Sequence, residues 1–288
     1  MNHKKNVLTI AGSDSSGGAG IQADIKTFEA LNIYSASIIT SVTAQNTQGV
    51  QQVFDLPDDI VSSQLNSVLS DINFSAVKIG MLKRQSYIEI VARKLQEHSP
   101  IIIVLDPVMI SSSGHRLLDE DALLSLIKNI FPLASLITPN IPEAATLLGK
   151  NTEWIEANLK EACNQLIEKF SLTAVLLKGG HLTGNNCEDT LASVTQKNDN
   201  STLKSSNSIQ YHTYKYPKSL TNNTHGTGCT LASAITAFLA QDFPLETAVQ
   251  YAGEFLQIAL STANLQNVGN GFGPLNHHAY NFRQLKSS

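Results

Sequence analysis

Short apolar runs alternate along this chain with segments in which apolar residues recur at helical spacing. The runs of apolar and β-branched residues predict strands at 6–11, 35–44, 76–80, 101–105, 133–137 and 174–177. Helical spacing follows the first run, with Ile21, Ile25 and Phe28 expected on one face. The run at 101–105 holds no polar residue, as expected of a parallel strand buried on both faces. The alternation predicts an α/β fold with a doubly wound, mainly parallel central sheet flanked by helices.

The pattern changes between residues 188 and 217. Polar and apolar residues alternate on either side of the polar tract 197–208, which predicts two short strands. We interpret this region as a small peripheral hairpin with a mobile tip. Helical spacing returns at 231–240 and again after Pro244. Because the chain shows no linker and no internal repeat, it is predicted to be a single domain, residues 1–288.

Composition narrows the classes of function. The chain has 288 residues, 42% of them hydrophobic, so it can bury a large core. Its net charge of -4 and the lack of a basic run argue against nucleic acid as a partner. No apolar stretch is long enough to span a membrane, so no membrane partner is expected. Three cysteines without a Cys-x-x-Cys pair fit a reducing compartment, and we expect a cytoplasmic protein.

Polar residues gather where the predicted strands end. The carboxyl ends of parallel strands meet at one edge of the sheet, which is where such folds bind ligands. Asp106 and Glu143 could hold a magnesium ion there, directly or through water, and Lys178 could neutralise phosphate oxygens. His181 and His225 also fall near this edge and are interpreted as hydrogen-bonding supports. Each residue alone could equally cap a strand or pair with a neighbour, but the whole set predicts a site. Its other members are Gln45, Thr138 and Asn140.

A glycine-rich loop at 12–20 follows the first predicted strand. Its glycine spacing is similar to a P-loop, but Gly18 and Ala19 stand where that motif needs Lys and Ser or Thr. It is also similar to a dinucleotide fingerprint, but the acid expected about twenty residues later is missing. The loop therefore either lets the backbone approach some ligand or makes a tight turn.

A second glycine-rich segment, at 224–230, leads directly into the predicted helix at 231–240. The first amides of a helix have no intrahelical partner and carry the positive end of its dipole, so they form an anion site. Cys229 lies in that field, which would lower its pKa and let the thiolate take a proton from an alcohol. The alternative is a small buried cysteine of the core. On this segment alone the two interpretations are evenly balanced.

The motifs together resemble those of the hydroxymethylpyrimidine and phosphomethylpyrimidine kinases of thiamine biosynthesis, in the ribokinase-like group. They occur in the family's order from the first strand to the penultimate helix: AGSDSSGGAGIQAD (11–24), AQNT (44–47), KIGM (78–81), DPVM (106–109), TPNIPE (138–143), KGGH (178–181) and HGTGCT (225–230). The chain departs from the family pattern in the polar tract 197–208 and at the extreme C-terminus.

This resemblance implies a ribokinase-like kinase that uses ATP and Mg²⁺. Its first acceptor would be the hydroxymethyl group of 4-amino-5-hydroxymethyl-2-methylpyrimidine, and its second the resulting monophosphate. It further implies a homodimer.

The resemblance also assigns roles to residues. Cys229 would act as the base, and Gly226, Thr227 and Gly228 would form the anion hole. Gln45 suits the pyrimidine, because a carboxamide can accept from the ring amine and donate to the adjacent ring nitrogen. The other matching positions are Gly12, Asp24, Met81 and Val108 for the substrate, and Thr138, Asn140 and Lys178 for the nucleotide.

Two rival functions stay open. A pyridoxal or pyridoxine kinase shares the fold and the glycine loop, but typical members carry Asp at the position of Cys229. A catalytically silent pyrimidine-binding protein of the same fold would tolerate loss of the base or of the metal acids, and here all of those positions are filled.

Overall fold

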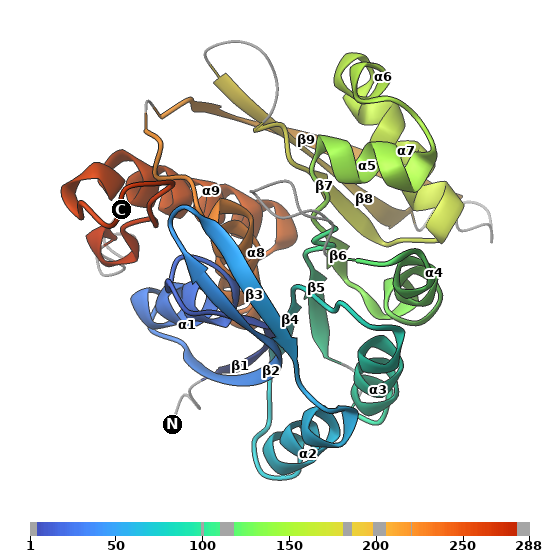
Figure 1. Ribbon diagram of the computed structural model, residues 1–288. Helices are drawn as coiled ribbons and strands as arrows, with labels where there is room; N and C mark the ends of the chain where they lie inside the picture. The colour runs from blue at the N-terminus through green and yellow to red at the C-terminus, as the bar shows by residue number, and fades with distance from the viewer. Residues whose placement is uncertain are drawn as a thin grey trace.

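The computed structural model describes residues 5–98, 101–109, 118–180, 186–197, 206–219 and 221–280. Across these residues a nine-stranded sheet runs in the order β3-β2-β1-β4-β5-β6-β7-β8-β9 (Figure 1). Strands β2, β1, β4, β5, β6 and β7 pair in parallel, which confirms the mainly parallel prediction. The strands are β1 (Asn6–Asp14), β2 (Tyr34–Asn46), β3 (Gly49–Asp55), β4 (Ala76–Ile79), β5 (Ile102–Leu105), β6 (Leu136–Ile137), β7 (Ala174–Leu177), β8 (Asn186–Lys197) and β9 (Ser206–Pro217).

Helices cover both faces of the sheet (Figure 1). They are α1 (Gly20–Ala30), α2 (Asp58–Leu69), α3 (Gln85–Gln96), α4 (Glu120–Asn129), α5 (Ile141–Leu148), α6 (Thr152–Ala157), α7 (Leu159–Phe170), α8 (Thr227–Ala240) and α9 (Leu245–Ser261). Successive residues of one strand point to opposite faces, so Val7 packs with α1, α8 and α9 whereas Leu8 packs with α2 to α7. The core is therefore split into two apolar layers by the sheet.

Helix α8 is the most deeply placed of these helices. Every residue from Thr230 to Ala240 is buried, because α1 and α9 cover the sides that the sheet leaves open. A helix that is apolar all round requires such a position. Its N-terminus lies at the carboxyl edge of the sheet, close to Asp106 and Lys178.

The structure differs from the sequence-based predictions in four places. Strand β3 was not predicted; it pairs antiparallel with β2 at the edge of the sheet, where its residues Gln51 and Gln52 are exposed. Strand β6 has only two residues, because Phe131–Leu133 forms a 3-10 turn. Ile25 is 38% exposed, and the neighbouring Asp24 faces inward instead. The predicted hairpin, β8 and β9, continues the main sheet beside β7, and its predicted mobile tip lies outside the described residues.

Among the described residues no helix is both long and apolar enough to cross a membrane.

Candidate active site at the carboxyl edge of the sheet

Asp106 and Lys178 form an ion pair at the edge where the sequence predicts a site. Asp106 follows β5 and Lys178 follows β7, and Lys178 Nζ lies 2.7 Å from Asp106 Oδ1. Thr138 donates its hydroxyl to the same oxygen at 3.1 Å. Burial would lower the pKa of Lys178, but Asp106 and Glu143 together raise it, so the ammonium stays charged. Lys178 thus brings a positive charge to this edge of the sheet, where Asp106 balances it.

The N-terminus of α8 faces this ion pair. A Cβ atom placed on Gly228 would lie 3.4 Å from both Asp106 Oδ2 and Lys178 Nζ, so the glycine keeps the backbone close to the two charges. The N–H of Thr227 is donated to Thr224 at 3.3 Å, so it contributes less to an anion site than predicted. Gly228 and Cys229 follow it in the first turn, where N–H groups have no intrahelical partner. Of the predicted anion-hole residues Gly226, Thr227 and Gly228, the amide of Gly228 is thus the one in the first turn that faces the ion pair, and the anion hole itself stays a prediction.

The prediction that the pKa of Cys229 falls was wrong. Burial raises the pKa of the Cys229 thiol to about 11, and Asp24 and Asp106 act in the same direction. Lys78 and a backbone hydrogen bond from Gly20 lower it, but by less. The helix start favours the anion locally, whereas the loss of water around the sulfur is the larger effect. In the ligand-free protein Cys229 is thus a thiol at neutral pH.

Asp24 belongs to a buried ion pair that the sequence reasoning missed. Lys78 Nζ lies 2.9 Å from both Asp24 oxygens, and the side chains of both residues are wholly buried. Thr9 and Ser233 also donate to this carboxylate, at 2.6 and 2.7 Å. Ser233 lies one turn after Cys229 on α8, so the ion pair sits beneath the cysteine. Both oxygens of Asp24 are engaged inside the core, which does not support direct contact with a ligand; that contact stays a prediction.

Glu143 and Asn140 cap the N-terminus of α5. Asn140 Oδ1 accepts from the Glu143 N–H at 2.9 Å, and Glu143 Oε2 accepts from the Asn140 N–H at 2.8 Å. Burial, with a contribution from Asp106, raises the pKa of Glu143 to about 7, although Lys178 opposes this. A capping role is therefore present, while the predicted metal and nucleotide roles stay predictions.

Gly12 and Met81 lie together beside Thr40 and Ser41 of β2. A Cβ atom on Gly12 would lie 2.7 Å from Met81 Cε, so the glycine lets the tip of the methionine pack closely against the backbone here. Val108 donates its N–H to the Asp106 carbonyl at 2.8 Å and is partly exposed beyond β5. These positions are compatible with walls around a flat ring. The predicted support His181 lies outside the described residues.

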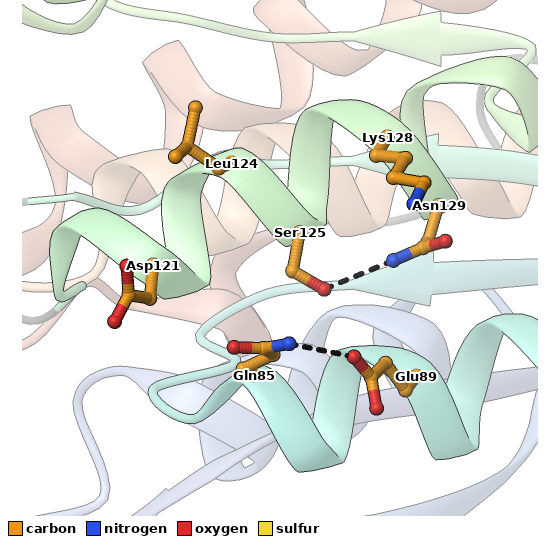
Figure 2. A pocket seen from close by; sticks show the side chains of 7 residues that line it. All are labelled: Gln85, Glu89, Asp121, Leu124, Ser125, Lys128 and Asn129. Carbon is orange, nitrogen blue, oxygen red and sulfur yellow. Dashed lines mark hydrogen bonds between the residues drawn. The ribbon is translucent and has the colours of Figure 1, made fainter.

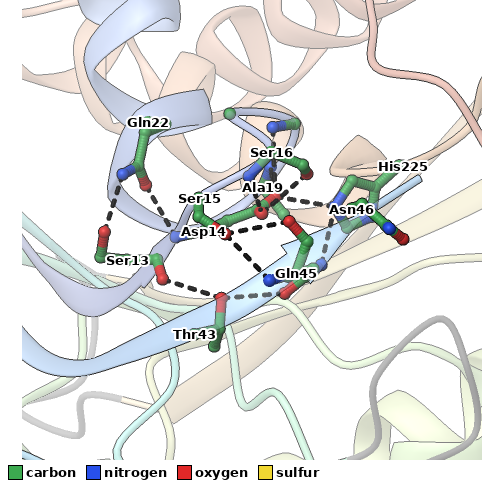
Figure 3. A network of polar contacts seen from close by, with 12 residues as sticks. Ser13, Asp14, Ser15, Ser16, Ala19, Gln22, Thr43, Gln45, Asn46 and His225 are labelled. Atoms are coloured by element: carbon green, nitrogen blue, oxygen red, sulfur yellow. Dashed lines mark hydrogen bonds and ion pairs between the residues drawn. The ribbon is translucent and has the colours of Figure 1, made fainter. Parts of the chain in front are cut away.

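The glycine loop at 12–20 is folded around its own acid, Asp14. Asp14 Oδ2 accepts from the N–H groups of Gly18 at 3.1 Å and Ala19 at 2.8 Å, and Oδ1 accepts from the Ser16 N–H at 2.8 Å (Figure 3). His225 Nε2 lies 2.8 Å from the same Oδ2. The loop amides are thus occupied by the chain's own carboxylate, and they are not an open anion site.

Two of the missed residues carried a sequence signal. Lys78 is a charge within an otherwise apolar parallel strand, and such a charge needs a buried partner. Asp14 precedes Ser, Ser and two glycines, a composition typical of a turn in which a carboxylate accepts from backbone N–H groups. Neither signal identifies the partner, because Asp24 and His225 come from other elements.

A hollow lies between α3 and α4, away from this edge of the sheet (Figure 2). The two hydrogen bonds within its lining, Gln85 to Glu89 and Asn129 to Ser125, each join residues one turn apart on a single helix. Neither hydrogen bond therefore links α3 to α4 across the hollow. The residues that line it are Gln85, Glu89, Asp121, Leu124, Ser125, Lys128 and Asn129. We therefore place the candidate site at the sheet edge.

Comparison with known proteins gives a consistent family assignment. Residues 14–276 match the family model described as phosphomethylpyrimidine kinase. The chain is 44% identical over 272 residues to the hydroxymethylpyrimidine/phosphomethylpyrimidine kinase of Rhizobium meliloti, covering 94% of this chain and 96% of that protein. It is 43% identical over 272 residues to the thiamine biosynthesis bifunctional protein ThiED of Geobacter sulfurreducens, covering 94% of this chain. The match spans about half (52%) of that longer relative.

Solved structures confirm the fold. The crystal structure of phosphomethylpyrimidine kinase (thiD) from Clostridium difficile is 41% identical, with a TM-score of 0.71, covering 88% of this chain and 98% of that chain. The pyridoxal kinase from Staphylococcus aureus in complex with ADP is 30% identical, with a TM-score of 0.83, covering 97% of this chain and 96% of that chain. The predicted ribokinase-like α/β architecture is therefore confirmed, and the two named activities share it.

Proposed function

The chain belongs to the phosphomethylpyrimidine kinase family, and we propose that it makes the pyrimidine diphosphate precursor of thiamine in two phosphorylations. ATP would first phosphorylate the hydroxymethyl group of 4-amino-5-hydroxymethyl-2-methylpyrimidine, and then the monophosphate formed. One observation carries the proposal: the Asp106–Lys178 pair faces the N-terminus of α8, which carries Cys229. The ADP complex of the S. aureus pyridoxal kinase supports ATP as the donor.

The charges and amides of this edge suit phosphoryl transfer, which needs positioning and charge neutralisation more than covalent help. Lys178 and the amides of Gly228 and Cys229 would bind the oxygens of the transferred group. The substrate hydroxyl then forms the new O–P bond while the bond between the γ-phosphorus and ADP breaks. The hydroxyl proton passes to the thiolate form of Cys229, which becomes the thiol.

Magnesium fits this site only in part. Among the described residues no group of three or more His, Cys, Asp and Glu side chains could hold a metal ion. Mg²⁺ in kinases is held by one or two carboxylates together with phosphates and water, and Asp106 suits that role because its Oδ2 lies toward Gly228. Glu143 suits it less, because both of its oxygens accept from backbone N–H groups. When bound, the ion would neutralise charge on the nucleotide phosphates.

A homodimer in the cytoplasm completes the proposal. The dimer rests on the family resemblance, and light scattering of the purified protein tests it. Cytoplasmic location is supported by the free state of Cys163, Cys187 and Cys229, which fits a reducing compartment.

Pyridoxal phosphorylation is the second candidate, because the pyridoxal kinase structure superposes with the higher TM-score of the two. Sequence identity favours a pyrimidine acceptor, because the chain is 41–44% identical to the two pyrimidine kinases and 30% identical to the pyridoxal kinase. The test is steady-state ATP consumption with hydroxymethylpyrimidine, its monophosphate and pyridoxine as separate acceptors, with products identified by phosphorus NMR. Conversion of both pyrimidines supports the proposal, and turnover of pyridoxine alone overturns it. If no acceptor reacts, the protein is a binder rather than a kinase.

A further inference from the structure

His225 links the start of α8, the glycine loop at 12–20 and the end of β2. In the proposed function, α8 lies at the transferred phosphate and the end of β2 lies at the pyrimidine ring. His225 precedes α8, it contacts Asp14 in the glycine loop, and its Nε2 lies 3.1 Å from Nε2 of Gln45 at the end of β2 (Figure 3). Asp14 is 4% exposed and His225 is 9% exposed, so water does not compete freely for these contacts. The N-terminus of α8 and the residue predicted to read the pyrimidine are thus joined through a single imidazole.

The backbones around His225 interlock. A Cβ atom on Gly18 would lie 2.5 Å from His225 Cδ2, and a Cβ on Gly226 would lie 1.8 Å from the Gly18 carbonyl oxygen. Gly226 has a φ of +85°, which an L side chain rarely adopts. The His225 N–H is also donated to Gly273 at 3.2 Å. The imidazole therefore has little freedom to turn away from Asp14 and Gln45.

The protons in this network can be assigned from the charge on Asp14. Burial would raise the pKa of Asp14, but hydrogen bonds from His225, Ser16 and Ala19 hold it at about 2. An ionised carboxylate only accepts, so the His225 Nε2 that contacts it carries a proton directed at Asp14 Oδ2. A nitrogen that carries this proton cannot accept from the amide of Gln45.

The orientation of the Gln45 carboxamide follows from that assignment. Its oxygen therefore faces His225, where it shares the single Nε2 hydrogen with Asp14 Oδ2, and its amino group faces the Thr43 hydroxyl, which lies 3.2 Å from the other end of the carboxamide. Thr43 can accept, because it donates its own proton to the Ser13 carbonyl at 3.0 Å. One lone pair and one N–H of the carboxamide are left for a ligand, in a fixed order. This order matches a ring that offers an amine next to a ring nitrogen acceptor.

We propose that His225, held by Asp14, is a positioning residue that fixes the orientation of the Gln45 carboxamide and so selects an aminopyrimidine acceptor over a pyridine one. This inference rests on the proposed function. It assigns to the Asp14–His225 pair a role in acceptor choice, in addition to holding the loop against α8.

The test compares His225→Leu, which removes the donor, with His225→Gln, whose side-chain amide can again donate to Asp14. His98→Leu is the matched control, because His98 is exposed just beyond the end of α3 and its ring hydrogen-bonds to the Lys94 carbonyl of that helix. For each variant, kcat and KM are measured with hydroxymethylpyrimidine, pyridoxine and ATP. Equilibrium binding of hydroxymethylpyrimidine is measured by calorimetry.

We expect His225→Leu to weaken hydroxymethylpyrimidine binding and to raise its KM roughly ten- to a hundredfold, because polar edges of the ring lose ordered partners. The KM for ATP should change less than about twofold, and His225→Gln should recover most of the loss. In Gln45→Leu, adding His225→Leu should cost little more, because the residue that it positions is already gone.

Equal losses with hydroxymethylpyrimidine and pyridoxine would overturn the inference, as would additive losses in the double variant or a failure of His225→Gln to recover binding. Such results would mean that His225 only supports the fold. A wild-type protein that neither binds nor phosphorylates hydroxymethylpyrimidine would overturn the proposed function as well, which distinguishes the two failures.

Discussion

Replacing Cys229 should separate the two phosphorylations that we propose for this site. In the first step the acceptor is a neutral alcohol, whose proton must leave as the O–P bond forms. In the second step the acceptor is a phosphate monoester, which is already an anion near neutral pH. A base is therefore needed for the first step only. Cys229→Ala should lower kcat/KM of the first step by roughly 10²- to 10⁴-fold, the range typical of base removal. The second step should change less than about tenfold.

The raised pKa of Cys229 adds a quantitative signature. With a pKa of about 11, roughly one thiol in 10⁴ is ionised at pH 7 in the ligand-free protein. The thiolate fraction rises tenfold with each pH unit below that value. The kcat/KM of the first step should therefore climb with a slope near one on a logarithmic scale between about pH 6 and 9. The second step should lack this climb.

Rapid-quench measurements with each acceptor supplied separately, followed by chromatography of the products, test both statements. Cys229→Ser is the matched control for shape, because the hydroxyl fills the position without acting as a base at these pH values. It should behave as Cys229→Ala does in the first step. Equal losses in both steps, or a first step that is independent of pH in the wild-type protein, would refute the assignment of Cys229 as the base.

Three further outcomes follow from the charged residues. Lys78→Met should lower the free energy of unfolding by about 3–5 kcal/mol in urea titrations, because it leaves Asp24 buried without its counter-ion; a loss below about 1 kcal/mol would contradict this. The pKa of Asp14 is depressed to about 2 from 3.8, so its ionisation contributes about 2 kcal/mol of stability above pH 4. That contribution is lost as the pH falls toward 2, and acid titration of wild-type protein and Asp14→Asn should show their stabilities converging there. Asp106→Asn should raise the Mg²⁺ concentration for half-maximal activity at least about tenfold, whereas Glu143→Gln, which can still cap α5, should leave it unchanged; the reverse order would restore Glu143 as the metal ligand.

The sequence was sufficient to predict the parallel sheet, because its central strands are short and almost wholly apolar. It was insufficient for β3, because an edge strand needs only one covered face and the polar side chains at Gln51 and Gln52 conceal it. It also predicted that Asp106 and Lys178 lie at one edge of the sheet, since that rule depends on strand direction alone. The local sequence pattern thus predicts the central strands, which are apolar on both faces. It misses an edge strand, because only one face of that strand must be apolar.

The paired polar side chains of the site could be identified only from the fold. Lys78 and Asp24 are 54 positions apart, and Asp14 and His225 are 211 apart, so no spacing rule connects them. Each pair forms because α1, α8 and the first strands pack against one another. The same packing explains why Asp24, which the family resemblance relates to the substrate, is engaged in the core.

Cys229 shows where local reasoning about chemistry fails. The position of the thiol in the first turn of a helix correctly indicates a field that favours the thiolate, and Lys78 adds to that field. The sequence carries no information on how much water the packed α8 excludes, however, and desolvation is the largest contribution to the pKa. The sign of the shift was therefore decided by burial, a property of the whole fold. For the same reason, a sequence motif can identify a candidate base but not its protonation state at neutral pH.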